Sequence, residues 1–280
     1  MLNCNLLNFL ALTLMIMSAS VLTSASSSSS SSLPDLFINH DHYYIDKVQH
    51  YIEYYDELFS KLRYEPIHLV ELGVQNGGSL ELWKEYFSHP NTKITGIDIN
   101  EKVCELEFES GIETFCFNLG HPQSVLDWND GRSFTIVIDD ASHIQEDVIL
   151  DFSVFFKNLV PGGLYIVEDI CTSYWEPYSG GLGNPQSMME FFKLLLDIIN
   201  IYYFQKADEQ IYSSKYVGYF GAEFVDYFAA WIEEIRFLDN LIIVKKRMIA
   251  KTSAGIRINS GRIQHIFPLD NSRNMTPISL

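Results

Sequence analysis

Residues 70–79, VELGVQNGGS, decide the fold. They begin inside a short apolar run, 67–72, which has the length of a buried strand. The glycines that follow allow a sharp turn and a close approach of the backbone to a ligand. Apolar residues then recur at Leu80, Trp83 and Phe87, which is the spacing of an amphipathic helix. The stretch therefore predicts a strand, a ligand-facing turn and a helix.

The same alternation continues along the chain. Short apolar runs bounded by turn residues predict four more strands, at 94–99, 114–117, 134–139 and 164–168. Helical patterns separate them, and we expect the last of these helices to end at Pro161-Gly162-Gly163. Another amphipathic helix, over 48–62, precedes the first strand. Strands separated by helices indicate a parallel sheet covered on both faces.

Two further runs, 232–238 and 241–246, flank Asp239-Asn240, which is a hairpin signal. A parallel sheet closed by an antiparallel pair is a specific topology. The predicted fold class is α/β, with a doubly wound, mostly parallel seven-stranded sheet (Rossmann-like) and an antiparallel final hairpin. We expect a single folded domain over 41–247.

The chain has 280 residues, of which 47% are hydrophobic and 20% are charged. This composition excludes collagen, a coiled coil and a disordered acidic tail, and it fits one globular domain. Lys and Arg number 19 against 36 Asp and Glu, which gives a formal net charge of −17. A protein this acidic is a poor candidate for gripping phosphate backbones, so we expect no nucleic-acid partner.

The first 34 residues carry no charged side chain. The apolar run 6–17, followed by small residues, is typical of a signal peptide, which we place at 1–25. The run is short for a membrane span of about 20 residues, although extended through Leu22 it would serve as an uncleaved membrane anchor. We therefore expect secretory entry, to a secreted or lumenal location, in preference to a buried helix of a cytosolic protein.

Two further segments flank the expected domain. A serine-rich tether covers 26–40, because seven consecutive serines cannot bury apolar surface. A basic tail covers 248–280, and it either docks onto the acidic domain or does not pack against it. The sequence does not decide between a monomer and a homo-oligomer.

Three cysteines lie beyond the leader, at Cys104, Cys116 and Cys171. They form no zinc-binding pair and allow at most one disulfide. The plainest interpretation is three ordinary thiols.

Acidic side chains gather where two consecutive predicted strands end. The sequence IDDASH closes one strand with Asp139 and Asp140 and places His143 just beyond, while Glu168 and Asp169 close the next. Carboxylates held this close repel one another unless a cation neutralises them. Oxygen ligands suit a hard ion, Mg²⁺ or Ca²⁺, better than zinc. Capping of the following helices is the structural alternative, and for the whole set we favour a metal site.

The second strand ends in GIDI, where the carboxylate of Asp98 can accept both hydroxyls of a ribose. Together with the glycine-rich turn, this resembles the nucleoside pocket of class I S-adenosylmethionine methyltransferases. A dinucleotide-binding oxidoreductase is the rival, but its G-x-G-x-x-G motif is missing from the sequence.

Over roughly 41–247 the chain resembles the metal-dependent sugar O-methyltransferases of macrolide biosynthesis, the mycinamicin and macrocin type, and their cephalosporin hydroxylase-like relatives. The resemblance rests on Asp46-Lys47, on His50-Tyr51 and on the motifs VELGVQNGGSLELWKEYF, GIDI, IDDASH, VPGGLYIVEDICTSYW and IRFLDNLIIVKKR. The chain departs from the family at Ala141, where Gly is usual. It also departs at 117–122, which replaces a Gly-Asp-Gln-like segment that normally lies near the adenine.

The resemblance implies the site. By it, Mg²⁺ is held by Asp140, Glu168 and Asp169, and His143 is the general base. Contacts to the donor, S-adenosylmethionine, are implied for Glu71, Gly73, Gly77, Asp98, Asn118 and Asp139.

The implied reaction is methylation of a small-molecule or glycan acceptor with vicinal hydroxyls. An alcohol is a poor nucleophile, so a base must remove its proton as the bond forms, and a chelated divalent ion lowers the hydroxyl pKa. Two alternatives stay open: an acceptor that is a catechol-like phenol, and a catalytically silent carbohydrate-binding protein on the same fold. Binding of the donor separates the silent protein from the two enzymes.

Overall fold

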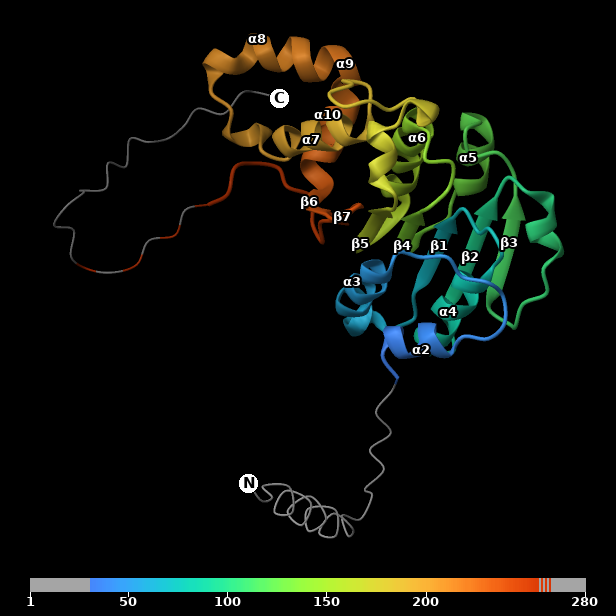
Figure 1. Ribbon diagram of the computed structural model, residues 1–280. Helices are drawn as coiled ribbons and strands as arrows, with labels where there is room; N and C mark the ends of the chain where they lie inside the picture. Colours follow the sequence, from blue (N-terminus) through green and yellow to red (C-terminus); the bar gives the residue numbers. More distant parts are fainter. Residues whose placement is uncertain (1–30, 257, 259, 261, 263–280) are drawn as a thin grey trace, which may run out of the picture. The chain divides into compact units, whose positions relative to one another are not determined.

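A seven-stranded sheet in the order β3-β2-β1-β4-β5-β7-β6 organises the computed structural model of the chain (Figure 1). The parallel strands are β1 (His68–Leu72), β2 (Lys93–Asp98), β3 (Ile112–Cys116), β4 (Phe134–Asp139) and β5 (Leu159–Val167). The hairpin β6 (Ile232–Leu238) and β7 (Leu241–Lys246) adds antiparallel to β5. The structure describes residues 31–256, 258, 260 and 262, so the predicted leader lies outside the described residues. The predicted fold class is confirmed.

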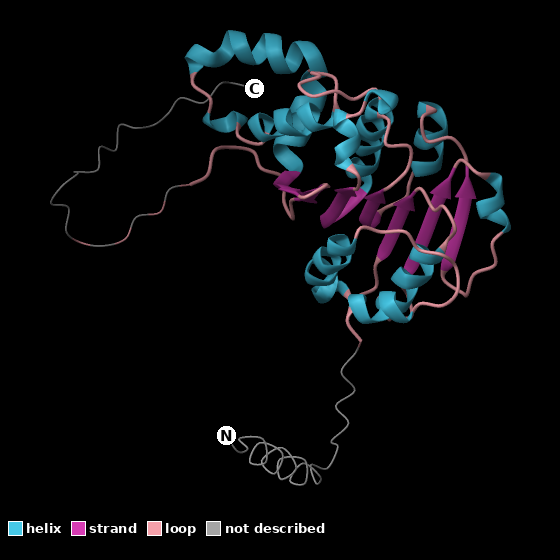
Figure 2. Ribbon diagram, in the orientation of Figure 1, coloured by secondary structure: helices cyan, strands magenta, loops and turns pink. Residues whose placement is uncertain are grey.

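Helices cover both faces of the sheet (Figure 2). One face carries α2 (Leu33–Asn39), α3 (Gln49–Phe59) and α4 (Gly78–Tyr86). The other face carries α5 (Pro122–Asn129), α6 (Gln145–Phe155), α7 (Met188–Ile198) and α10 (Ala222–Trp231), with the short α8 (Glu209–Tyr212) and α9 (Gly218–Phe220) between the last two. Successive strand residues point to opposite faces, so Ile136 and Ile138 pack toward α3 and α4, whereas Val137 packs toward α6.

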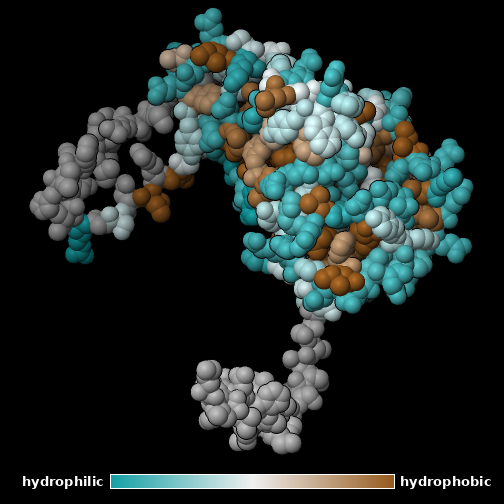
Figure 3. Space-filling view, in the orientation of Figure 1, coloured by the Kyte–Doolittle hydropathy of each residue, from teal (hydrophilic) through white to brown (hydrophobic). Residues whose placement is uncertain are grey.

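These two apolar layers bury the large aromatic side chains, including Trp83 of α4 and Phe152 of α6. The face drawn in Figure 3 is mostly hydrophilic and is broken by separate apolar patches. Among the described residues, no helix is long and apolar enough to cross a membrane.

The segment Pro161-Gly162-Gly163 was predicted to end a helix, but it lies inside β5. The preceding helix already ends at Phe155 and continues only as a 3-10 turn, Phe156–Asn158. Between the pairs Phe134–Leu159 and Ile136–Leu164 the strand register shifts, and the three residues fall in this irregularity. Pro and Gly therefore mark a bulge here, and a bulge is one of the positions in a sheet where these residues are tolerated.

The domain begins earlier than predicted, so the expected tether 26–40 is too long. Residues 33–39 form α2, in which Leu33 and Leu36 are buried. The Leu33 N–H donates to Asp56 Oδ1 of α3 at 3.0 Å. At the other end, the first described part of the basic tail is docked: the Lys251 N–H donates to the Ala230 carbonyl at 2.9 Å.

Cys104 and Cys116 form a disulfide, which corrects the interpretation of three free thiols. The bridge joins the 3-10 segment Glu101–Glu105, which follows β2, to the last residue of β3. Cys171 is free.

Candidate active site

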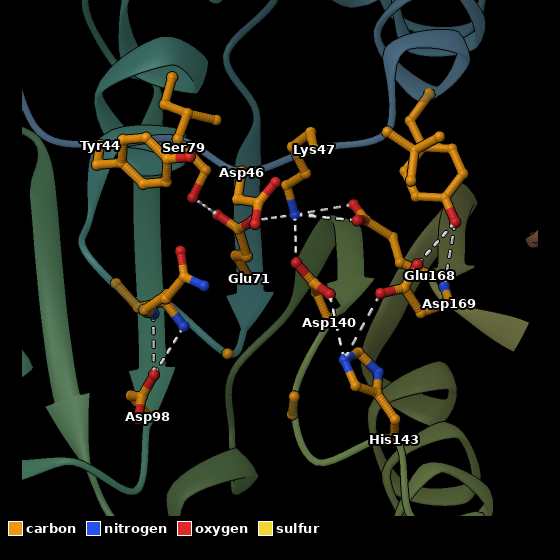
Figure 4. A pocket seen from close by; sticks show the side chains of 17 residues that line it. Tyr44, Asp46, Lys47, Glu71, Ser79, Asp98, Asp140, His143, Glu168 and Asp169 are labelled. Atoms are coloured by element: carbon orange, nitrogen blue, oxygen red, sulfur yellow. Dashed lines mark hydrogen bonds and ion pairs between the residues drawn. The ribbon is translucent and has the colours of Figure 1, made fainter. Parts of the chain in front are cut away.

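A cavity of about 440 Å³ opens beyond the carboxyl ends of β1, β2, β4 and β5 (Figure 4). In a doubly wound sheet this is the edge at which ligands bind. The extended segment 44–48, which leads into α3, forms one wall. The cavity is lined by Tyr44, Ile45, Asp46, Lys47, Val48, Tyr51, Glu71, Gly73, Val74, Gln75, Ser79, Asp98, Asp140, Ala141, His143, Glu168 and Asp169.

Three of its acidic side chains point toward the α3 and α4 face of the sheet. Glu71, Asp140 and Glu168 each stand two residues beyond a strand residue that packs on that face: Leu69, Ile138 and Ile166. Glu71 lies within β1, and Asp140 and Glu168 are the first residues after β4 and β5, where the alternation of the strand still holds, so the three carboxylates converge. A backbone hydrogen bond joins the ends of β4 and β1: the Asp140 N–H donates to the Leu72 carbonyl at 2.8 Å.

The cation at this convergence is the ammonium of Lys47. Its Nζ lies 2.5 Å from Asp140 Oδ2, 3.0 Å from Glu168 Oε1 and 3.0 Å from Glu71 Oε1. Only 3% of the Lys47 side chain is exposed. Burial alone would lower the pKa of Lys47, but the surrounding carboxylates, Glu168 most of all, raise it well above its ordinary value. The ammonium is therefore charged at neutral pH.

Asp140 and Asp169 each have one carboxylate oxygen that accepts no hydrogen bond from the part of the chain that the structure describes. Asp140 Oδ1 lies 3.7 Å from His143 Nε2, and Asp169 Oδ2 lies 3.9 Å from the same nitrogen. Asp169 Oδ1 accepts hydrogen bonds from the Tyr51 hydroxyl and from Asn240 Nδ2, both at 2.9 Å. Burial, and next the charge of Asp169, raise the pKa of Tyr51, so this hydroxyl keeps its proton.

The backbone at this point is strained. His143 has a φ of 56° and Asp169 a φ of 52°, which is the left-handed region that residues with a Cβ rarely adopt. Such conformations cost on the order of 1–3 kcal/mol each and are concentrated at functional sites. The His143 and Asp169 side chains point toward each other (Figure 4).

The free oxygens meet the requirements of a hard divalent ion. Ligand atoms of Asp140, His143 and Asp169 lie within 4.8 Å of one another. Mg²⁺ prefers oxygen ligands and keeps several waters, so the two carboxylates suffice to hold it and leave the imidazole free. Glu168, the third predicted ligand, borders the same cavity; Lys47 contacts both of its carboxylate oxygens, at 3.0 and 3.1 Å, and the Tyr55 hydroxyl donates to Oε1 at 2.6 Å.

The glycine-rich turn occupies the opposite side of the cavity. Gly73 has a φ of +85°, and a Cβ there would lie 2.1 Å from the Asp140 carbonyl oxygen, so the turn requires glycine. Asp98 Oδ2 accepts from the N–H groups of Val74 (2.8 Å) and Gln75 (3.1 Å). Asp98 thus holds the turn in place while its carboxylate still borders the cavity.

A second cavity of about 130 Å³ adjoins the first, with which it shares Gly73, Asp98 and Ala141. Its other walls are mostly apolar, with polar groups from a loop and a helix: Ile97, Ile99, Asn118, Leu119, Gly120, Ser142 and Asp147. This size and lining suit a flat heterocycle beside the Asp98 carboxylate.

The predicted site residues fall into three groups. The large cavity brings together Glu71, Gly73, Asp98, Asp140, His143, Glu168 and Asp169, and the small one contains Asn118. Glu71 borders the cavity, but its carboxylate is fully buried and accepts from Ser79 Oγ (2.7 Å) and Trp83 Nε1 (3.1 Å). Gly77 lines neither cavity; it precedes α4 with a φ of 89° and faces Leu106 and Phe108.

The donor contact predicted for Asp139 is not supported. Its carboxylate is 1% exposed, lines neither cavity and accepts from the Tyr165 hydroxyl at 2.7 Å. The alternation along β4 explains this, because Asp139 follows Val137 on the α6 face, away from Asp140. Burial there raises the pKa of Asp139 to about 7.

Sequence reasoning assigned no role to Lys47, Tyr51, Tyr55 or Asn240. One signal was available for Lys47, which is the single Lys or Arg between residues 35 and 60 in a strongly acidic stretch. Tyr51 and Tyr55 are four residues apart and lie on the buried side of α3. Their polar partners, however, are 113 or more residues away, beyond the reach of a local pattern.

The strand order, the closing hairpin and a ligand cavity beyond β1, β2, β4 and β5 define a Rossmann-like methyltransferase fold. Solved structures agree: MycE methyltransferase in complex with Mg, SAH and mycinamycin VI superposes with a TM-score of 0.64 and 25% identity, covering 82% of this chain and 58% of that one. No family model matches the chain.

Among curated proteins, the chain is 36% identical over 156 residues to 8-demethyl-8-alpha-L-rhamnosyl tetracenomycin-C 2'-O-methyltransferase of Streptomyces olivaceus, covering 52% of this chain and 40% of that protein. It is 33% identical over 190 residues to mycinamicin VI 2''-O-methyltransferase of Micromonospora griseorubida, covering 60% and 45%. The chain thus spans less than half the length of these relatives. The predicted resemblance to macrolide sugar O-methyltransferases is confirmed.

Proposed function

We propose that the chain is an S-adenosylmethionine-dependent, Mg²⁺-assisted O-methyltransferase of a sugar or another polyhydroxy acceptor. One observation carries the proposal: two carboxylate oxygens and the imidazole of His143 converge in the same cavity as the Gly73 turn and Asp98. The named relatives that methylate sugar hydroxyls support it.

The donor would extend across both cavities. The apolar walls of the small cavity suit the adenine, and the carboxylate of Asp98, which borders both, is placed to accept from the ribose hydroxyls. The sulfonium end would then lie over the Gly73 turn, where the missing Cβ leaves the backbone open to close approach. This arrangement directs the methyl group into the large cavity.

Transfer forms a bond from the acceptor oxygen to the methyl carbon and breaks the carbon–sulfur bond, whose electron pair stays on sulfur. His143 Nε2 accepts the hydroxyl proton, and the negative charge of the acidic side chains around the imidazole favours its protonated form. A divalent ion, when held by Asp140, Glu168 and Asp169, would supply charge that lowers the pKa of neighbouring hydroxyls. The wall formed by 44–48 limits the access of water.

The test is methyl transfer from labelled donor by the purified chain, with Mg²⁺ and a panel of glycans and polyols, with and without a chelator. We expect transfer to at least one vicinal diol, lost with chelator and restored by Mg²⁺. Transfer to catechols alone would favour the phenol alternative. A chain without measurable affinity for S-adenosylmethionine would be the silent carbohydrate-binding protein.

We also propose that the protein works in the secretory pathway, secreted or lumenal, either cleaved or anchored by its leader. The uncharged, apolar leader supports this, and so does the Cys104–Cys116 bridge, because disulfides persist mainly in oxidising compartments. A reporter fused after Ser32 should enter the endoplasmic reticulum. The same fusion with aspartates placed in the run 6–17 should stay cytosolic, and a wild-type fusion that stays cytosolic would refute the proposal.

A further inference from the structure

The disulfide lies between the two segments that line the small cavity. One segment follows β2: it contributes Asp98 and Ile99 to the cavity wall, and Cys104 lies farther along it. The other segment follows β3, where Cys116 shortly precedes the lining residue Asn118. In the proposed function these two segments hold the adenine and the ribose of the donor. The bridge therefore joins both sides of the proposed donor site.

We infer that the Cys104–Cys116 bridge positions the donor site and makes donor affinity depend on the redox state of the protein. With the bridge formed, the loop 99–111 between β2 and β3 is held in its donor-binding position. With the bridge reduced, this loop moves and the donor binds more weakly. The inference rests on the donor site in the proposed function, and it goes beyond the stability that any disulfide contributes.

A series of short-range contacts leads from the bridge to the carboxylate of Asp98. The 3-10 segment Glu101–Glu105, which contains Cys104, begins after Asn100, whose Oδ1 accepts from the Lys102 N–H at 3.1 Å. The Asn100 N–H in turn donates to Asp98 Oδ1 at 2.8 Å. A shift of the 3-10 segment would therefore disturb Asn100 and, through it, the carboxylate that is placed to accept from the ribose.

Little else in the 3-10 segment anchors it to the domain. Within this segment Val103 is the one buried side chain, 2% exposed, and Cys104 is itself exposed. Cys116, by contrast, is fixed by the sheet, because it is the last residue of β3 and lies opposite Asp98 in the parallel pairing of β2 with β3. The bridge thus ties a weakly anchored segment to a rigid one, so its loss should lower the free energy needed for local opening.

The same loop also reaches the wall of the large cavity. Beyond the bridge, the Phe108 ring lies 5.5 Å from the ring of Tyr43, and the Tyr43 hydroxyl donates to the Glu107 carbonyl at 3.3 Å. Tyr43 immediately precedes the wall segment 44–48. Loosening the loop therefore removes support from a second side of the donor site.

Reduction requires an external dithiol, and the exposure of Cys104 gives such a reagent access. One thiolate of the dithiol attacks the Cys104 sulfur and displaces Cys116 as a thiolate, which leaves a mixed disulfide. The second thiol of the reagent then displaces Cys104, so that two electrons and two protons pass to the cysteines and the reagent becomes a disulfide. In the oxidising compartment proposed for the protein, the bridge stays formed and the donor site stays assembled.

The test compares the oxidised full chain with the chain reduced by dithiothreitol, using S-adenosylhomocysteine as the calorimetric probe. Mass spectrometry after alkylation should first show Cys104 and Cys116 protected in the oxidised protein. Reduction should raise the dissociation constant of the probe about tenfold, as expected when about one molecule in ten keeps the loop in its binding position. Equal affinity in the two states would overturn the inference, and so would reactive Cys104 and Cys116 in protein purified without reductant.

Cysteine variants and a measurement of the fold serve as controls. The double variant Cys104→Ser, Cys116→Ser should bind the probe as weakly as the reduced wild type and should not respond to dithiothreitol. Cys171→Ser, which removes a free thiol, should respond as the wild type does. Near-ultraviolet circular dichroism, which reports the packing of the buried aromatic side chains, should be unchanged on reduction. A loss of this signal in parallel with the affinity would mean that reduction unfolds the domain, and it too would refute the inference.

Failure of the inference can be told apart from failure of the proposed function. A chain that binds the probe with the same affinity before and after reduction keeps its donor site and refutes only the role of the bridge. If the oxidised chain does not bind the probe, both proposals fall. Redox-dependent binding of the probe without methyl transfer to any acceptor would uphold the role of the bridge and refute the enzyme alone.

Discussion

The two sides of the large cavity are built differently. On the side of the glycine-rich turn, the hydrogen bonds from the turn to Asp98 join residues 23 and 24 positions apart, from one strand end to the next, and a local bond from the Asn100 N–H engages Asp98 Oδ1. On the acidic side, the contacts of Asp140, Glu168 and Asp169 span 71 to 121 positions, to Lys47, Tyr51 and Asn240. The turn can therefore form with the central strands alone. The acidic side is complete only once α3 and the final hairpin have docked.

The largest effect should come from breaking the acidic side at His143. His143→Ala should lower turnover by about 10²–10⁴-fold, the usual contribution of a positioned general base, and leave donor and metal binding nearly intact. Steady-state kinetics and calorimetry would measure both. His89→Ala, in the loop that enters β2 at the opposite end of the sheet, is the control. A His143→Ala enzyme with full activity would refute the assignment.

The next effect should arise on the turn side, where the disulfide ties the loop after β2 to β3. Replacing Cys104 and Cys116 by serine opens a loop with a sequence separation of 12. It should lower the free energy of unfolding by about 3 kcal/mol. Urea unfolding would show this, with Cys171→Ser as the free-thiol control. Metal affinity should be unchanged, and a parallel loss of it would mean that the two sides are not independent.

A smaller loss is expected from Asp98→Ala, which removes the acceptor for the ribose and for the Val74 and Gln75 N–H groups. S-adenosylmethionine binding should weaken by about 1–3 kcal/mol. Asp98→Asn keeps one carbonyl oxygen and should lose less. Calorimetry that finds unchanged donor affinity in Asp98→Ala would contradict the proposed donor site.

The smallest effect should follow Tyr51→Phe, which removes one of two side-chain donors to Asp169 Oδ1 while Asn240 keeps the other. A single hydrogen bond is worth about 0.5–1.5 kcal/mol, so Mn²⁺ affinity should fall only severalfold. Tyr54→Phe on the same helix is the matched control, because that ring packs against His50 instead. A loss of more than about tenfold would indicate that Tyr51 has a more direct role.

Local sequence predicted most of the fold. The hairpin strands 232–238 and 241–246 match β6 and β7, because alternation and the Asp239-Asn240 turn are local properties. The errors have physical causes. Pro161-Gly162-Gly163 was predicted to end a helix, because Pro and Gly commonly do so, but these residues form a bulge in β5. The helix α2, with Leu33 and Leu36 buried, was missed because it directly follows the run of serines in the sequence. Asp139 was assigned to the wrong face of β4, because a shift of one position along a strand moves a side chain to the opposite face of the sheet.

The sequence by itself determined that carboxylates stand at the ends of β2, β4 and β5 and that glycines follow β1, so that acidic side chains and an open backbone gather at one edge of the sheet. Only the tertiary structure decided which carboxylate oxygens are engaged. Lys47 contacts Glu71, Glu168 and one oxygen of Asp140, while Tyr51 and Asn240 hold one oxygen of Asp169. These partners come from segments far along the chain, and their contacts depend on how α3 and the hairpin pack against the sheet, which no local periodicity encodes.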